Sequence, residues 1–192
     1  MYGLERYLGI EKDFIEAKFY VAFNQDAVYS EFFTREIILL GAEIEAALKE
    51  LCNRIDGSTP GCMSDYKRII LSKLPNIVSI SVCEKQSGKP ISPFENWDKG
   101  VLNWWSVYTG IKHNLVDSKA TLGVALTMLQ AYLVLIFCVT AMKQDIHINV
   151  LNAPKLFQVG FELKGSALLQ NMEMITIYDR GSVLGELGYS EG

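Results

Sequence analysis

The residues best suited to chemistry lie in one short stretch, residues 104–114, which carries one of the two histidines of the chain. Its polar end reads Lys112-His113-Asn114, and Thr109 lies one helical turn before His113. Histidine is the side chain that most readily takes up and releases protons near neutral pH. A neighbouring lysine can stabilise negative charge that builds up on a phosphate group. These residue types indicate proton transfer at a phosphate ester.

Helical spacing would arrange this stretch in two rows. Trp105, Thr109 and His113 follow one another at intervals of four residues and would form one row of a helix. The adjacent row would be apolar and would hold Trp104, Tyr108, Ile111 and Leu115. The two tryptophans are more typical of packing anchors than of platforms that stack on nucleic-acid bases.

Competing explanations exist for each polar residue. A single histidine on a helix edge is more often structural than catalytic. Glu43 and Glu45 are candidates to orient His113, with Glu43 the favoured one, although carboxylates on helices are usually solvated. The chain has no phosphate-binding glycine loop, Gly-x-Ser-x-Gly motif or paired metal-binding histidines. No cofactor or metal is expected.

Helices should position this stretch. Ser30 is a good N-cap for a helix that runs to about Ile55, with apolar residues at steps of three and four. A further helix or irregular segment is expected at 13–23 and a shorter helix at 64–74, followed by a strand or extended segment at 77–82. Asp98 is a candidate cap for the histidine-bearing helix. Short connections favour antiparallel packing of the helices.

Residues 120–142 contain no charged side chain and are long enough to cross a membrane. Helices that are apolar all round lie either in a membrane or in the middle of a bundle. The amphipathic helices before this segment need a central partner, so a central bundle helix is the preferred interpretation and no membrane association is expected.

The C-terminal region changes to a period of two, which is typical of strands. Residues 157–163 and 172–178 alternate apolar and polar side chains, with turn signals at Gly165-Ser166 and at 179–182. The sequence therefore predicts a mainly α-helical bundle of four or five helices at residues 1–150. A small β-rich appendage would follow at residues 151–192.

Composition limits the classes of function. The chain has 192 residues and a net charge of −4, so nonspecific attraction of nucleic acid by the whole molecule is not expected. Its four cysteines lack the spacing of a zinc site. The first residues lack the apolar segment of a signal peptide, so a cytoplasmic location is expected.

The stretch Trp104-Trp105-x-x-Tyr108-x-x-Ile111-Lys112-His113-Asn114 resembles the histidine-bearing helix of the HEPN superfamily, the higher eukaryotes and prokaryotes nucleotide-binding domains. It is most similar to stand-alone bacterial members with two tryptophans and a tyrosine before a lysine-histidine pair. Similarity extends to residues 30–49, to the apolar helix after His113 and to residues 153–157. It covers most of the chain, and only the His113 stretch is specific.

The resemblance implies a helical bundle that forms a homodimer, with two copies of the motif facing each other across a cleft. Many relatives are metal-independent ribonucleases of toxin-antitoxin, abortive-infection and antiviral systems, so RNA or a nucleotide and an antitoxin protein are the implied partners. Active members carry an arginine five positions before the histidine, followed by a polar residue. Tyr108 and Thr109 occupy these positions here. A phenol lacks the permanent charge and forked donors of arginine.

Two functions remain as predictions. In the first, His113 transfers protons at a ribose 2′-hydroxyl or a leaving 5′-oxygen, Lys112 stabilises the phosphorane and Thr109 orients a phosphate oxygen, while Tyr108 and Asn114 line the substrate site. A degenerate form of this domain would bind RNA or a nucleotide without cutting it. In the second, the bundle is a catalytically silent module for dimerisation or protein interaction.

Overall fold

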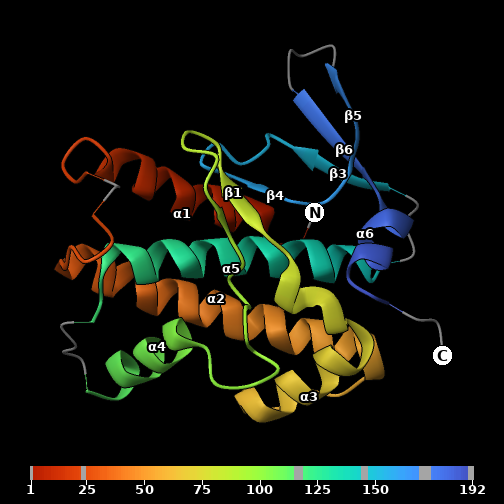
Figure 1. Ribbon diagram of the computed structural model, residues 1–192, viewed down its shortest axis with the longest axis horizontal. Coiled ribbons are helices and arrows are strands. Elements are labelled where there is room, and N and C mark those ends of the chain that lie inside the picture. Colours follow the sequence, from red (N-terminus) through yellow and green to blue (C-terminus); the bar gives the residue numbers. More distant parts are fainter. Residues whose placement is uncertain (1, 23–24, 115–118, 144–146, 169–173, 190–192) are drawn as a thin grey trace.

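The computed structural model describes residues 2–22, 25–114, 119–143, 147–168 and 174–189. Two long helices run side by side through its middle (Figure 1). Helix α2 (Glu31–Asp56) begins where the Ser30 hydroxyl accepts a hydrogen bond from the Phe33 N–H over 3.3 Å, as predicted from the sequence. It ends at Gly57, whose φ of 77° suits glycine.

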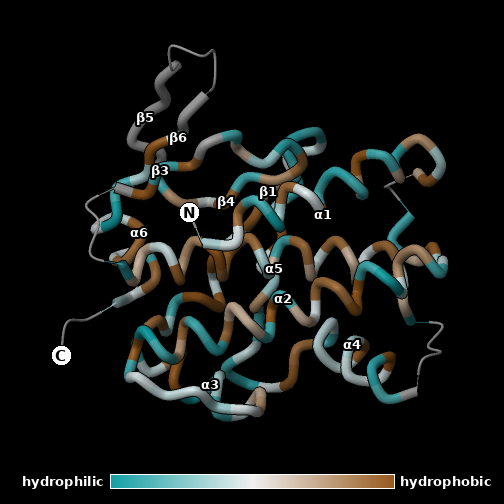
Figure 2. The backbone as a smooth tube through the Cα atoms, turned by 180° about the vertical axis from the view of Figure 1, so that it is seen from behind, coloured by the Kyte–Doolittle hydropathy of each residue, from teal (hydrophilic) through white to brown (hydrophobic). Residues whose placement is uncertain are grey.

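Helix α5 (Leu122–Ala141) is the central element of the bundle. It contacts α1, α2 and α4 on different sides, and strands β3 and β4 and helix α6 as well. Most of its residues are therefore buried against protein, and Figure 2 shows many hydrophobic residues along it. The helix is long and apolar enough to cross a membrane, but 78% of its most apolar stretch is buried within the molecule. This burial is that of a core helix.

Shorter helices cover these two. Helix α1 (Leu4–Ala17) lies on α5, while α3 (Met63–Lys73) and α4 (Asn103–Asn114) lie on α2 (Figure 1). A 3₁₀-helix, η1 (Pro75–Ser79), follows α3. Helix α6 (Arg180–Glu186) packs against α5 near the C-terminus. The mainly α-helical architecture predicted from the sequence is thus confirmed.

Strands form two small antiparallel sheets in the described ranges. The first has the order β2-β1-β4 and joins β1 (Val82–Glu84), β2 (Pro90–Ile91) and β4 (Phe157–Val159). Val82 is opposite Ile91 on one side and Val159 on the other. The second has the order β3-β6-β5 and joins β3 (His147–Leu151), β5 (Leu163–Leu168) and β6 (Met174–Asp179). The C-terminal region is thus tied to the middle of the chain through β4.

Several local predictions were wrong, and each has a physical reason. The first helix occupies Leu4–Ala17 rather than 13–23, because its apolar stripe includes a buried glutamate, Glu11, that breaks the pattern. Pro75 opens the 3₁₀-helix η1, which overlaps the strand or extended segment expected at 77–82, and β1 begins only at Val82. Helix α4 begins at Asn103, so Asp98 does not cap it.

The last turns also differ from the prediction. Gly165 and Ser166 lie inside β5, where the pairing with β6 shifts register between Leu163 and Gly165. The expected turn at Asp179 is the start of α6, because the Asp179 carboxylate accepts a hydrogen bond from the Ser182 N–H over 2.9 Å.

Candidate functional site

Aromatic side chains fix the position of the histidine-bearing helix, α4. Trp104 is 3% exposed, and its indole N–H donates a 2.8 Å hydrogen bond to the Pro93 carbonyl. Its ring meets Phe94 edge-on at 5.9 Å and Trp105 at 6.1 Å between ring centroids. Trp105 in turn lies 5.2 Å from the ring of Tyr108. Both tryptophans are therefore packing anchors, as predicted.

The ring of Tyr108 packs against α2 at Gly41. A Cβ atom added to Gly41 would lie 2.1 Å from the nearest carbon of the Tyr108 ring, so only glycine allows this contact. The Tyr108 hydroxyl donates a 3.2 Å hydrogen bond to Glu45 Oε1. Burial, and then the nearby Glu45 carboxylate, raise the pKa of Tyr108. The residue at the arginine position of the motif is therefore packed into the protein and neutral.

Glu45 also binds the lysine of the motif. Lys112 Nζ donates to the same oxygen, Glu45 Oε1, over 2.9 Å and lies 5.4 Å from the centre of the Tyr108 ring. The Lys112 side chain is 47% exposed. Its hydrogen bond to Glu45 raises the pKa of Lys112. Lysine, tyrosine and glutamate thus form one cluster, which we call the Glu45 cluster: Glu45, Tyr108 and Lys112.

Thr109 and His113 are not part of this cluster. The Thr109 hydroxyl donates back to its own helix, with the Trp105 and Ser106 carbonyl oxygens both at 3.0 Å. His113 is exposed and makes no hydrogen bond or ion pair with any described residue. Asn114 ends α4, and its side chain lies outside the described part of the structure.

Glu43 forms hydrogen bonds with residues of other helices and not with α4. Its Oε1 accepts a 2.5 Å hydrogen bond from Arg6 of α1, and its Oε2 accepts one of 3.2 Å from the Tyr132 hydroxyl of α5. Burial and the Glu43 carboxylate raise the pKa of Tyr132. The prediction that Glu43 or Glu45 orients His113 is therefore corrected: neither contacts His113, and the carboxylate that reaches α4 is Glu45, at Tyr108 and Lys112.

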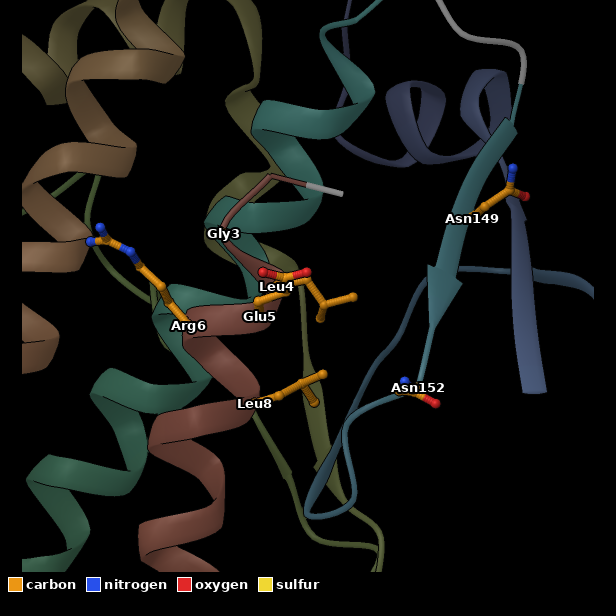
Figure 3. A pocket seen from close by; sticks show the side chains of 7 residues that line it. All are labelled: Gly3, Leu4, Glu5, Arg6, Leu8, Asn149 and Asn152. Carbon is orange, nitrogen blue, oxygen red and sulfur yellow. The ribbon is translucent and has the colours of Figure 1, made fainter. Parts of the chain in front are cut away.

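A cavity of about 390 Å³ lies where the start of α1 faces β3 (Figure 3). Gly3 and Glu5 line it on the helix side, with Asn149 and Asn152 on the other. The Arg6 side chain points away from the two asparagines in this view, consistent with its bond to Glu43 (Figure 3). This cavity holds no histidine and is not part of the α4 motif.

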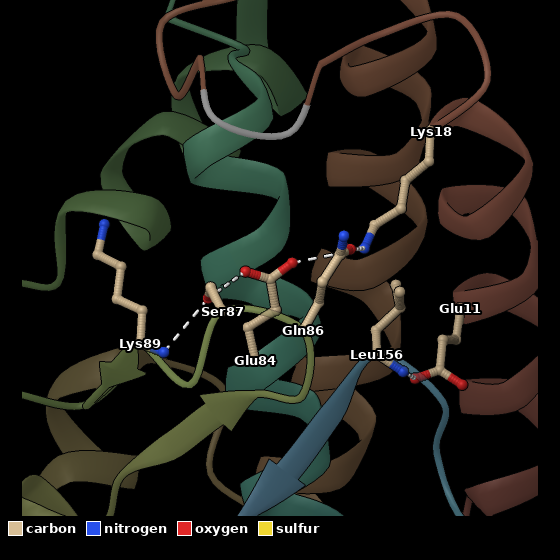
Figure 4. Close-up of polar contacts among 7 residues, drawn as sticks. All are labelled: Glu11, Lys18, Glu84, Gln86, Ser87, Lys89 and Leu156. Carbon is tan, nitrogen blue, oxygen red and sulfur yellow. Dashed lines mark hydrogen bonds and ion pairs between the residues drawn. The ribbon is translucent and has the colours of Figure 1, made fainter.

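Sequence reasoning missed one buried polar connection. Glu11 of α1 is 1% exposed and accepts the Lys155 and Leu156 backbone N–H groups, each over 2.8 Å; Figure 4 shows its contact with Leu156. The signal was present, because Glu11 lies on the same face of α1 as the buried Tyr7 and Phe14. A carboxylate on such a face requires hydrogen-bond donors from another segment.

Cysteines and metal-binding side chains form no further site in the described residues. The four cysteines are free thiols. No three His, Cys, Asp or Glu side chains come together as metal ligands within the described ranges. Comparison of the chain with known protein families, curated proteins and solved structures finds no match in any of the three.

Proposed function

We propose that this chain is a HEPN-like, RNA-directed domain that binds RNA or a nucleotide at the exposed end of α4 without cutting it. The observation that carries this proposal is the shared bond of Tyr108 and Lys112 to Glu45. Two of the three groups required for cleavage, Lys112 and Thr109, already have partners within the protein. His113 is the exposed member of the set.

Binding at this end of α4 would be local, and few charged side chains would contribute to it. Lys112 and His113 are both exposed in the last turn of the helix, where an imidazole and an ammonium can meet a phosphate. Glu45 offsets part of the charge of Lys112, and the net charge of −4 supplies no general attraction. The decrease of affinity with salt should therefore be shallow, as expected for one or two phosphate contacts.

Cleavage would need more than this arrangement offers. A phosphorane carries two negative charges at its oxygens, and in this chain a packed phenol replaces the arginine at that position. Lys112 would have to leave Glu45 to take over that role. The proposal therefore expects RNA binding without turnover, in an environment such as the cytoplasm where the thiols stay reduced.

Two assays on the same variants test the proposal. Binding of a fluorescent single-stranded RNA is measured by anisotropy, and cleavage of a mixed cellular RNA pool is measured in EDTA. His113→Ala and Lys112→Ala are compared with Lys12→Ala, which removes the same charge from an exposed position on α1. Weaker binding in the first two variants alone, without cleavage by any protein, is the expected result.

Other outcomes of these assays would support a different function. Cleavage by the wild type that is lost in His113→Ala would identify a metal-independent ribonuclease, of the kind found in toxin and phage-defence systems. No RNA binding by the wild type would remove the RNA-directed function and favour the second candidate.

That second candidate is a catalytically silent homodimer or interaction module. Phe19 and Tyr20, just after α1, are 83% and 88% exposed. Tyr20 itself, with Ala17, Val21 and Phe32, helps to line a largely apolar hollow of about 420 Å³. Two copies related by a twofold axis could cover each other's hollow, with the exposed Tyr20 in the contact. Light scattering of the wild type and Tyr20→Ser tests this: a dimer that becomes a monomer supports the module.

A further inference from the structure

A cavity of about 240 Å³ lies where the two small sheets and α5 come together. Figure 1 shows β3, β4 and β6 on the same side of α5. We call this cavity the junction cavity. Its apolar wall combines residues of α5, β3 and β4: Leu133, Phe137, Val150, Phe157 and Val159.

The β6 side of the junction cavity carries two hydroxyl groups. Thr176 and Tyr178 both line it and lie two residues apart, so their side chains are on the same face of the strand. Val150, directly opposite Thr176 on β3, also lines the cavity, so this face of the sheet is the one that meets it. The Tyr178 ring meets Phe137 of α5 edge-on, with 4.9 Å between the ring centroids. Tyr178 therefore extends from β6 across the junction towards α5.

Neither hydroxyl has a hydrogen-bond partner among the described residues. Tyr178 is only 6% exposed, yet its hydroxyl is not one of the described polar atoms that are sealed from solvent. Burial raises the pKa of Tyr178, so the hydroxyl keeps its proton at neutral pH and can donate it in a hydrogen bond. Most buried polar groups in folded proteins are paired. These two donors are thus available to a ligand that brings acceptor oxygens.

Lys85 adds one positive charge at the rim of the junction cavity. The residue is exposed, its backbone N–H donates to the Leu156 carbonyl over 2.9 Å, and its Nζ donates to the Pro154 carbonyl over 2.6 Å. Pro154 lines the cavity, so the ammonium is held at the wall. Lys85 forms no ion pair with any described residue, and its neighbour Glu84 bonds to Lys18 instead (Figure 4). No described acidic residue lines the cavity.

We propose that the junction cavity binds a small monocarboxylate with an apolar body, of the short-chain fatty acid kind. The carboxylate would pair with Lys85 and accept a hydrogen bond from Tyr178, while the chain would pack on the apolar wall. One lysine matches one negative charge, whereas a phosphate ester brings close to two and an amine would be repelled. Apolar walls with a few placed polar groups are the usual composition of small-ligand sites.

The volume limits the size of this ligand, and the location separates the site from the α4 motif. Sites for drug-sized ligands measure about 300–1,000 Å³, so a cavity of about 240 Å³ suits a shorter acid. The Glu45 cluster joins α2 and α4, and none of its residues lines the junction cavity. Binding of an acid here does not depend on whether α4 binds RNA.

Calorimetry and ligand-detected NMR with hexanoate test the proposal. Hexanamide has the same shape without the charge, and acetate has the charge without the chain. The wild type is expected to bind hexanoate with a Kd of about 1 mM or tighter. Each of the two matched ligands lacks one of the two contributions and should bind about tenfold more weakly or not at all.

Three variants change the junction cavity itself. Lys85→Gln removes the charge and should weaken hexanoate binding by about tenfold. Tyr178→Phe removes only the hydroxyl and should weaken it by about threefold to tenfold. Ala153→Leu fills part of the cavity from a half-buried position and leaves every donor in place, so it tests the site even if Tyr178→Phe does not fold.

Two matched substitutions outside the cavity are the controls. Lys155→Gln removes the same charge from the exposed residue next to Pro154, and Tyr189→Phe removes a hydroxyl from another partly buried tyrosine. Both should bind hexanoate as the wild type does. Equal binding of hexanoate and hexanamide, unchanged affinity in any cavity variant, equal losses in Lys85→Gln and Lys155→Gln, or no saturable binding by the wild type would overturn the proposal.

Discussion

The Leu156 backbone N–H donates a 2.8 Å hydrogen bond to the Glu11 carboxylate, 145 positions earlier in the chain. The other oxygen of Glu11 accepts the Lys155 N–H, also at 2.8 Å. One side chain on α1 therefore holds the segment that leads into β4. Because β4 pairs with β1, this carboxylate connects three distant parts of the chain.

Glu11→Ala is expected to lower the free energy of unfolding by about 2–4 kcal/mol, because two backbone N–H groups lose their acceptor in a buried place. Urea denaturation measures the change. Glu11→Gln keeps one acceptor oxygen and should lose less. Glu16→Ala, at an exposed position on the same helix, is the control and should change the free energy by less than about 0.5 kcal/mol. Equal effects at both positions would contradict the role assigned to Glu11.

Gly41→Ala should destabilise the protein although alanine favours helices. Its Cβ would lie 2.1 Å from the Tyr108 ring, and such overpacking costs about 1–3 kcal/mol. Gly9→Ala on α1 is the matched control, because a Cβ there meets nothing within 4 Å. It should stabilise the protein by about 0.5–1 kcal/mol. Opposite signs in thermal unfolding would support the close packing of α4 on α2, and two stabilising substitutions would contradict it.

The buried Glu36 on α2 should make the stability of the protein depend on pH. Its Oε1 bonds to Arg35 at 3.0 Å, but its Oε2 is buried without a described partner, and burial raises the pKa of Glu36. The folded protein then holds this proton more tightly than the unfolded chain. Stability is therefore lost as pH rises from the unfolded value of about 4.3 through the raised pKa of the folded state.

Glu36→Gln should remove the loss of stability that accompanies rising pH. At neutral pH the variant is expected to be more stable than the wild type by about 1 kcal/mol, and the difference should vanish below about pH 4. Urea denaturation across this pH range, with the exposed Glu95→Gln as control, measures it. A variant that is less stable than the wild type at neutral pH would show that Glu36 is needed as a carboxylate.

Sequence patterns predicted α2, α3, α4 and α5 because burial follows the helical period. The apolar face of α2 and the uncharged length of α5 are both visible in the residues alone. The partners of the carboxylates were not visible. Glu43 and Glu45 are two residues apart on one helix, yet Arg6 and Tyr132 bind the first and Tyr108 and Lys112 the second. Two residues correspond to about 200° of helical rotation, so Glu43 and Glu45 lie on nearly opposite sides of α2. The helix that each carboxylate meets depends on tertiary packing.

The same difference between the two carboxylates gives a test of the proposed RNA contact. Glu45→Gln removes the charge that holds Lys112, so its ammonium becomes available to a phosphate. RNA affinity at low salt should rise about threefold to tenfold. The dependence of log affinity on log salt should steepen by up to about 0.7, the value for one further phosphate contact on a single strand. Fluorescence anisotropy at several salt concentrations measures both quantities.

Glu43→Gln is the matched control, because it changes the net charge by the same amount but frees Arg6 on α1 instead of Lys112. If general charge alone governs binding, the two variants will gain affinity equally. If the exposed end of α4 is the contact, only Glu45→Gln will gain, and Lys112→Ala combined with Glu45→Gln will cancel the gain. A gain that survives in this double variant would exclude Lys112 as the phosphate ligand and would leave His113 as the group to test next.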